Sequence, residues 1–156
     1  MSLAKGSTYD NIWFEYVMDG MRDILITEYP GIKIYISPMI SGNENFQIRI
    51  WGTEADTSDR GADWWQKQYQ TGIYMYSVEQ NPNEVFWKNF YQHAERVYQL
   101  MANNTVYSTT VDSVQREWIN GHVESIVMNE YEEGEEDIEG LYVARLNFEC
   151  FVKRDY

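Results

Sequence analysis

Cysteine is almost absent from the chain, since Cys150 is the only one among 156 residues. A single cysteine excludes an intramolecular disulfide and every zinc site that is built from several cysteines. Long apolar runs are absent as well. Residues 1–10 contain none, which predicts no secretory signal, and no segment approaches the ~18 consecutive apolar residues of a membrane span. These absences predict a soluble protein that is made in a reducing compartment.

Basic residues are scarce: 12 Lys and Arg stand against 25 Asp and Glu, which gives a formal net charge of −13. Proteins that bind nucleic acid hold its phosphates with basic patches, so this chain is a poor candidate for that class. Its surface should instead repel nucleic acid. A phosphate-binding loop is missing too, because the segment 52–63, GTEADTSDRGAD, lacks the Gly-Lys-Ser ending of such loops.

Candidate catalytic side chains are few. The two histidines, His93 and His122, fall beside the apolar stripe of a predicted helix and at a predicted strand start, where surface histidines are common. Cys150 lies on the core-facing side of its predicted strand, where a thiol usually acts as a small inert apolar group. A nucleophilic triad needs a nucleophile, a base and an orienting group together. The sequence therefore predicts no enzyme, no cofactor and no metal.

Apolar and aromatic residues are plentiful, at 44% and 16% of the chain, which is too apolar for a disordered protein. The length predicts one domain, 1–156, that buries roughly two-thirds of its unfolded surface. Apolar residues recur at helical spacing over 8–29, a helix that Pro30-Gly31 ends. They recur again over 81–104, where Asn81 is the predicted N-cap and Pro82 the first helical residue.

Alternation of apolar and polar residues predicts strands on both sides of the second helix. The segments before it are a strand pair that turns at 41–45, a long polar loop and a third strand: 32–37, 46–52, 53–67 and 69–79. The segments after it are two strands around an acidic stretch, and one more ambiguous strand: 121–131, 140–154 and 110–118. The predicted fold is α+β, a mostly antiparallel β-sheet with two α-helices packed on one face, in the order α-β-β-loop-β-α-β-β.

Two groups of residues suggest an interaction surface. Trp64 and Trp65 end the predicted polar loop, and paired tryptophans there either anchor a partner or fold back onto the domain's own sheet. The stretch 129–140, NEYEEGEEDIEG, holds seven acids in ten positions, among them Glu132, Glu133, Glu135, Glu136 and Asp137. It lacks the ligand order of an EF-hand loop. We predict a solvated hairpin tip, able at most to bind calcium weakly, that projects into an assembly toward a bore or a basic patch on a neighbour.

The order of elements resembles a known family, the tail terminator (tail-completion) proteins of long-tailed bacteriophages. The resemblance rests on an opening helix like YDNIWFEYVMDGMRDIL, a strand pair with a long loop, a second helix and a last strand like GLYVARLNFECFV. It implies a structural virion protein without enzymatic activity. Such proteins form a ring, usually of six subunits, that caps the tail tube and joins it to the head connector.

The resemblance also implies partners and a location. The partners would be further copies of the chain, the tail tube protein and head-connector proteins of the neck, with no membrane. The protein would be made in the bacterial cytoplasm and end in the virion, where genomic DNA passes through the bore without specific binding. An excess of carboxylates fits such a bore, because it repels phosphates within a Debye length of about 8 Å.

Two other functions stay open from the sequence. A cone-like α+β domain that binds a small ligand or acts as an enzyme would need polar groups that converge in an apolar cavity, for which His93, Glu95 and Tyr98 are the candidates. An acidic DNA mimic would need carboxylates spaced along one face, whereas the densest acids fall in a single stretch.

Overall fold

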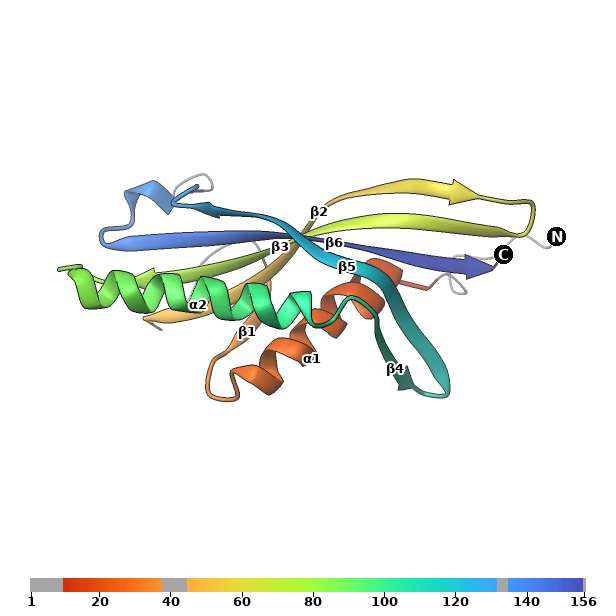
Figure 1. The fold of residues 1–156 in the computed structure, drawn as a ribbon, viewed down its shortest axis with the longest axis horizontal. Coiled ribbons are helices and arrows are strands. Elements are labelled where there is room, and N and C mark those ends of the chain that lie inside the picture. Colours follow the sequence, from red (N-terminus) through yellow and green to blue (C-terminus); the bar gives the residue numbers. More distant parts are fainter. Residues whose placement is uncertain (1–9, 38–44, 132–134, 156) are drawn as a thin grey trace.

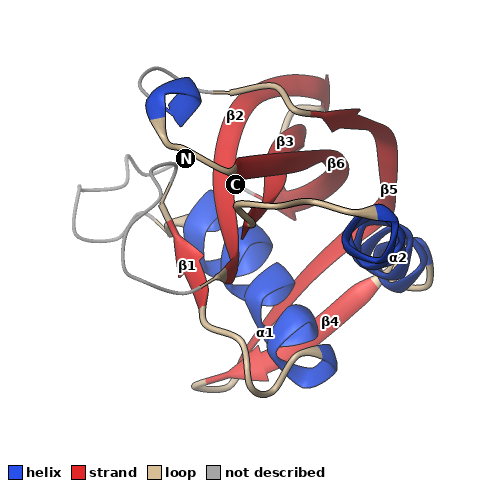
Figure 2. Cartoon of the chain, turned by 90° about the vertical axis from the view of Figure 1, so that its left-hand side faces the viewer, coloured by secondary structure: helices blue, strands red, loops and turns tan. Residues whose placement is uncertain are grey.

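The computed structural model describes residues 10–37, 45–131 and 135–155. Six strands form one sheet in the order β1-β2-β3-β6-β5-β4, and two helical segments pack against it (Figure 1). The strands are β1 (Ile34–Ile36), β2 (Phe46–Arg60), β3 (Trp64–Val78), β4 (Tyr107–Val111), β5 (Val114–Met128) and β6 (Leu141–Asp155). The fold is α+β, with a sheet that curls around the first helix (Figure 2).

The first helical segment begins as a π-helix, η2 (Trp13–Met18), and continues as α1 (Asp19–Glu28). The wider turn is visible in the bond from the Asp19 amide to the Phe14 carbonyl, five residues back. The segment ends just before Pro30, as predicted, because a residue that precedes proline disfavours helical angles. Its predicted start at residue 8 lies outside the described residues.

The second helix, α2 (Glu84–Ala102), begins two residues later than the predicted N-cap implies. Asn83 adopts extended angles, and its side-chain oxygen accepts a hydrogen bond from the Phe86 amide at 3.0 Å. Asn81 is therefore not the cap. The two asparagines offer the same capping chemistry, and only the backbone angles decide between them.

The loop predicted at 53–67 is wrong, because β2 and β3 run through it as one long hairpin that turns at residues 61–63. The strand pair predicted at 32–37 and 46–52 is wrong in direction, because β1 runs parallel to β2 and places Ile34 beside Ile48. The sheet is therefore mixed rather than antiparallel throughout. The ambiguous segment forms the β4–β5 hairpin, whose turn residues Asp112 and Ser113 both have positive φ, as a type I′ turn requires.

The two helical segments and one face of the sheet, called the core face here, enclose a single apolar core. Its fully buried members come from every layer: Val17, Met21, Leu25, Ile48, Ile50, Ile73, Met75, Val97, Met101, Trp118, Leu146 and Phe148. The opposite side of the sheet, called the outer face here, buries a smaller group at one end: Tyr74, Tyr76, Leu141 and Val143. Both helices thus lie on the same side of the sheet, as predicted.

Candidate functional site

The far ends of β2, β3 and β6 form an arm at one end of the sheet. Figure 1 shows these strand ends extending to the right of both helices. The strands stay paired to the end of the arm, where Arg60 of β2 lies opposite Trp65 of β3 and Trp64 of β3 lies opposite Asp155 of β6. The last nine residues of β2, Gly52–Arg60, are all exposed or half-exposed. The β2 strand of the arm is therefore largely uncovered, whereas Tyr69, Cys150 and Val152 of the other two strands stay buried on the core face.

The outer edge of β2 is open along this arm. β1 pairs only with Ile48–Ile50, and within the described ranges no strand pairs with the outer edge of β2 beyond them. Register shifts interrupt the β2–β3 ladder between Gly52 and Glu54 and again between Thr57 and Asp59. Bulges and charges are the usual devices that protect an edge from indiscriminate pairing. The β2 edge can therefore pair only with a strand that fits its bulges and its charges.

The other edge of the sheet is β4, which pairs only with β5 among the described strands. Its sequence, YSTTV, has no charge, and Ser108 and Thr110 are exposed. Val106 and Val114, at the two ends of the β4–β5 hairpin, are 58% and 47% exposed. Among the described strands, the sheet therefore has an acidic open edge along β2, with Glu54, Asp56 and Asp59, and a neutral open edge along β4.

The paired tryptophans do not act as one unit, because they open β3 and alternate between its two faces. Trp65 packs against the apolar core. The Trp64 ring lies on the outer face, over Gly61, with the Lys153 ammonium 4.6 Å from its centre. Of the two possibilities that the sequence left open, folding back describes Trp65. Trp64 is half-exposed near the tip of the arm, where it can also contact a partner.

The acidic stretch forms the connection of the β5–β6 hairpin, as predicted, and contains a short 3₁₀ helix, η3 (Glu135–Asp137). Glu132 and Glu133 lie outside the described residues, and the side chain of Glu136 is not described either. Glu135 is only 5% exposed, whereas Asp137 and Glu139 are exposed. The expectation of a wholly solvated tip is therefore wrong for Glu135, which the fold has buried.

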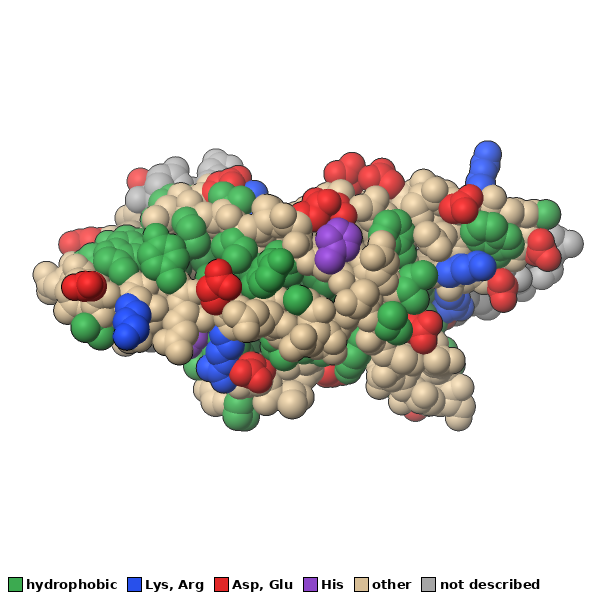
Figure 3. Space-filling model, viewed as in Figure 1, with side chains coloured by type: hydrophobic (Ala, Val, Ile, Leu, Met, Phe, Trp, Pro, Cys, Tyr) green, Lys and Arg blue, Asp and Glu red, His purple; other side chains and the backbone are tan. Residues whose placement is uncertain are grey.

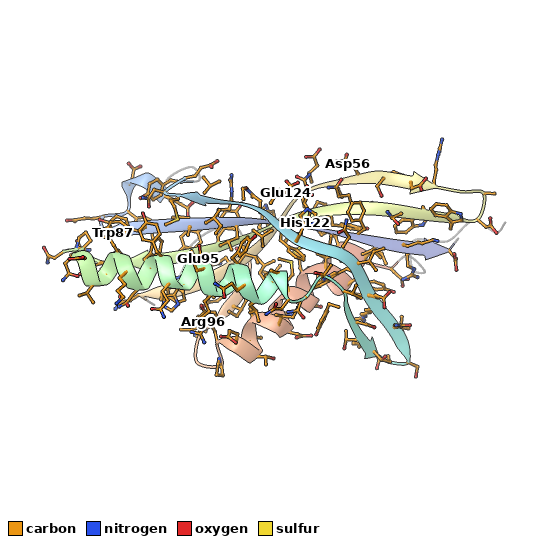
Figure 4. All side chains as sticks on the ribbon, in the orientation of Figure 1. Asp56, Trp87, Glu95, Arg96, His122 and Glu124 are labelled. Atoms are coloured by element: carbon orange, nitrogen blue, oxygen red, sulfur yellow. The ribbon has the colours of Figure 1, made fainter. Side chains whose placement is uncertain are left out.

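A second cluster, which the sequence did not single out, lies on the outer face where β5 crosses β6. It joins His122 and Glu124 of β5 to Glu149 of β6, with ligand atoms within 4.8 Å of one another. His122 Nε2 is 3.3 Å from Glu149 Oε2 and 4.0 Å from Glu124 Oε1. Burial, followed by the neighbouring Glu124, raises the pKa of Glu149. Figure 4 shows His122 and Glu124 together at this crossing, and Figure 3 shows red carboxylates beside the purple histidine near the centre of the view.

Irregular backbone builds this cluster. The β5–β6 register shifts between Ile119 and His122 and again between Val123 and Ser125, so β5 has extra residues on both sides of His122. Asn120 has a φ of 51°, which marks the first of these bulges. The pattern His-Val-Glu would have indicated that His122 and Glu124 share a face. Nothing in the sequence reports the register that brings Glu149 beside them.

The residues proposed for a ligand pocket do not converge. The His93 ring packs between Tyr29 and Phe46, with its Nδ1 3.2 Å from the Tyr29 hydroxyl. A hollow of about 220 Å³ beside it is lined by residues that include Phe46, Glu79, Phe86 and His93. Glu95 and Tyr98 do not line this hollow. The three side chains on which the ligand-binding alternative rested therefore do not line one pocket.

Comparison with known proteins adds no relative, since no protein-family model and no curated protein matches the chain. In the part of the chain that the structure describes, no helix has both the length and the apolar character needed to cross a membrane.

Proposed function

We propose that the chain is a structural virion protein that closes into a ring through its two open sheet edges and caps a phage tail tube, as a tail terminator does. The observation that carries the proposal is the mismatch of those edges. The β2 edge is long and acidic, with Glu54, Asp56 and Asp59, while the β4 edge is short and neutral. A ring needs contacts between two different surfaces of each subunit.

The charges favour this head-to-tail contact over a symmetric one. Two β2 edges side by side would place like charges opposite each other, which costs about 0.2–1 kcal/mol for each facing pair. A neutral β4 edge beside the β2 edge avoids that cost and continues the sheet from one copy to the next. Backbone hydrogen bonds then supply the affinity, as in other strand additions. By resemblance to the tail-terminator family, the ring would contain six copies of the chain.

The outer face supports the proposed passage of DNA. Cross-strand pairs place Glu54 and Asp56 on the same face as Glu149, with His122 and Glu124 beside it. If this face lines the bore, its carboxylates repel phosphates at the wall, and salt confines the repulsion to about 8 Å. DNA would then pass without being held. Trp64 and the exposed acids of the β5–β6 connection would contact the tail tube or the neck proteins.

The test is a pair of opposite charge substitutions on the neutral edge. S108E/T110E should prevent ring formation, because it sets acids against the acidic β2 edge, whereas S108K/T110K should keep or tighten the ring. A matched control is Q92E/Q99E, which adds the same charge on the exposed surface of α2. Light scattering and negative-stain electron microscopy, with and without purified tail tubes, measure the outcome. A protein that stays monomeric with tubes present and never caps their ends would refute the proposal.

A further inference from the structure

The hydrogen bond of His122 to its own strand determines what its ring offers to the neighbouring carboxylates. The ring Nδ1 lies 3.0 Å from the backbone carbonyl oxygen of Asn120. A carbonyl oxygen can only accept, so Nδ1 must carry the hydrogen of this bond. In the neutral ring, Nε2 then presents a lone pair. That lone pair faces Glu149 at 3.3 Å and Glu124 at 4.0 Å.

When both carboxylates are ionised, three hydrogen-bond acceptors therefore lie beside one another, and acceptors do not attract. A positive charge between them removes the conflict. A divalent metal ion does so with the ligand types that proteins use for zinc, an imidazole nitrogen and carboxylate oxygens. Metal-binding histidines almost always donate their other ring N–H to a carboxylate, a backbone carbonyl or water, as His122 does to Asn120.

The burial of the three side chains gives the site a closed and an open side. The Glu149 side chain is 7% exposed and accepts a hydrogen bond from Gln68 of β3, so it is held in place. Glu124 is 52% exposed, so its side chain can rotate toward a bound ion, whereas His122 keeps its bond to Asn120. That freedom is needed, because tetrahedral zinc ligands lie about 3.3 Å apart and those observed span up to 4.8 Å.

We propose that His122, Glu124 and Glu149 form a surface site for a divalent transition-metal ion of the zinc class, with water completing its coordination. Imidazole favours such ions over magnesium and calcium, which prefer sets of oxygen ligands. The site is separate from both open edges, so it does not depend on ring formation.

The experiment is a zinc titration of the untagged protein by isothermal calorimetry, after treatment with EDTA and in excess Mg²⁺ to occupy weak acidic sites. We expect one zinc ion per chain. H122Q and E124Q should each weaken binding by about 100-fold or more, beyond the 10–100-fold typical of losing an outer partner. H93Q removes the other histidine and E117Q removes an exposed acid of the same strand, so both should bind zinc within twofold of the parent.

Two results would overturn the proposal. No saturable zinc binding would mean that a proton held within the cluster, and no metal ion, resolves the conflict. Binding that survives in H122Q would place the metal elsewhere in this acidic chain. Circular dichroism of each variant ensures that a lost site is not a lost fold.

Discussion

Trp118 and Gly20 offer a sharp test of the core, because a side chain at Gly20 would force its neighbours to move. A β-carbon added at Gly20 would lie 2.6 Å from Cζ3 of the Trp118 ring. The ring itself is fully buried, packs between Tyr107 and Phe148, and donates a hydrogen bond from Nε1 to the Asn104 carbonyl at 3.0 Å. We therefore expect the two positions to be energetically coupled.

The magnitudes follow from those contacts. W118F removes part of the ring and leaves the Asn104 carbonyl without this donor, so it should cost about 2–4 kcal/mol. G20A should cost about 1–3 kcal/mol through overpacking, from which about 1 kcal/mol is recovered because alanine is the better helix former. In the double variant, phenylalanine lacks the ring carbon that the new methyl group meets. The loss of stability in the double variant should then be smaller than the sum of the two single losses by at least about 1 kcal/mol.

Urea denaturation followed by circular dichroism measures all four proteins of this cycle. Equal slopes against urea would license comparison of the free energies of unfolding. G31A is the matched control, because a β-carbon at Gly31 meets no atom within 4 Å. It should show no coupling to W118F. If G20A and W118F add to within about 0.5 kcal/mol, the close packing of α1 on Trp118 is refuted.

Two further predictions concern α2. N83A should lower the free energy of unfolding by about 1 kcal/mol, because it removes the observed N-cap, whereas N81A should change it by less than about 0.5 kcal/mol; equal losses would place the cap elsewhere. Burial, and then the charge of Arg96, lower the pKa of His93. The unfolded chain therefore binds this proton first, and stability is lost as pH falls below about 6.5 toward the lower folded pKa, by at most about 1.4 kcal/mol per pH unit. Urea denaturation at a series of pH values should show that H93Q removes this part of the slope, and an unchanged slope would contradict the prediction.

The sequence predicted those elements whose side chains meet a core. Burial on one side produces the apolar stripes of the two helices and the alternation of β6. These patterns predicted the described ends of the three elements to within a few residues. The β2 strand of the arm has no such pattern. Gly52–Arg60 has no fully buried residue, so its apolar and polar residues do not alternate in a way that predicts a strand. A polar strand and a polar loop then have the same composition.

The direction of strand pairing and the register between strands could not be predicted, for a related reason. Ile34 and Ile36 alternate in the same way whether their neighbour is parallel or antiparallel, so the pattern located β1 but not its partner's direction. The His122 cluster depends on bulges in β5 that shift the register by a residue or two. Such shifts are set by tertiary packing across the sheet. The sequence therefore shows which reactive side chains the outer face carries, but not the register that brings His122, Glu124 and Glu149 together.

The acidic connection between β5 and β6 shows how burial changes the design of an experiment. Seven acids in ten positions suggest replacing them all at once, and a lost function would then be read as lost charge. Glu135, however, is only 5% exposed and has interactions within the fold. A buried carboxylate is tolerated only where the fold compensates it, so E135Q should destabilise the protein by about 1–3 kcal/mol.

Asp137 and Glu139 supply the comparison, because both are exposed. D137N/E139Q should change the free energy of unfolding by less than about 0.5 kcal/mol, since exposed charges contribute little. Assembly should be compared only between this double variant and the parent, both fully folded by circular dichroism. If the double variant forms rings and caps tail tubes as the parent does, then these exposed acids only solvate the connection. If E135Q proves as stable as the parent, the burial of Glu135 has no energetic role, and the acids can be replaced together after all.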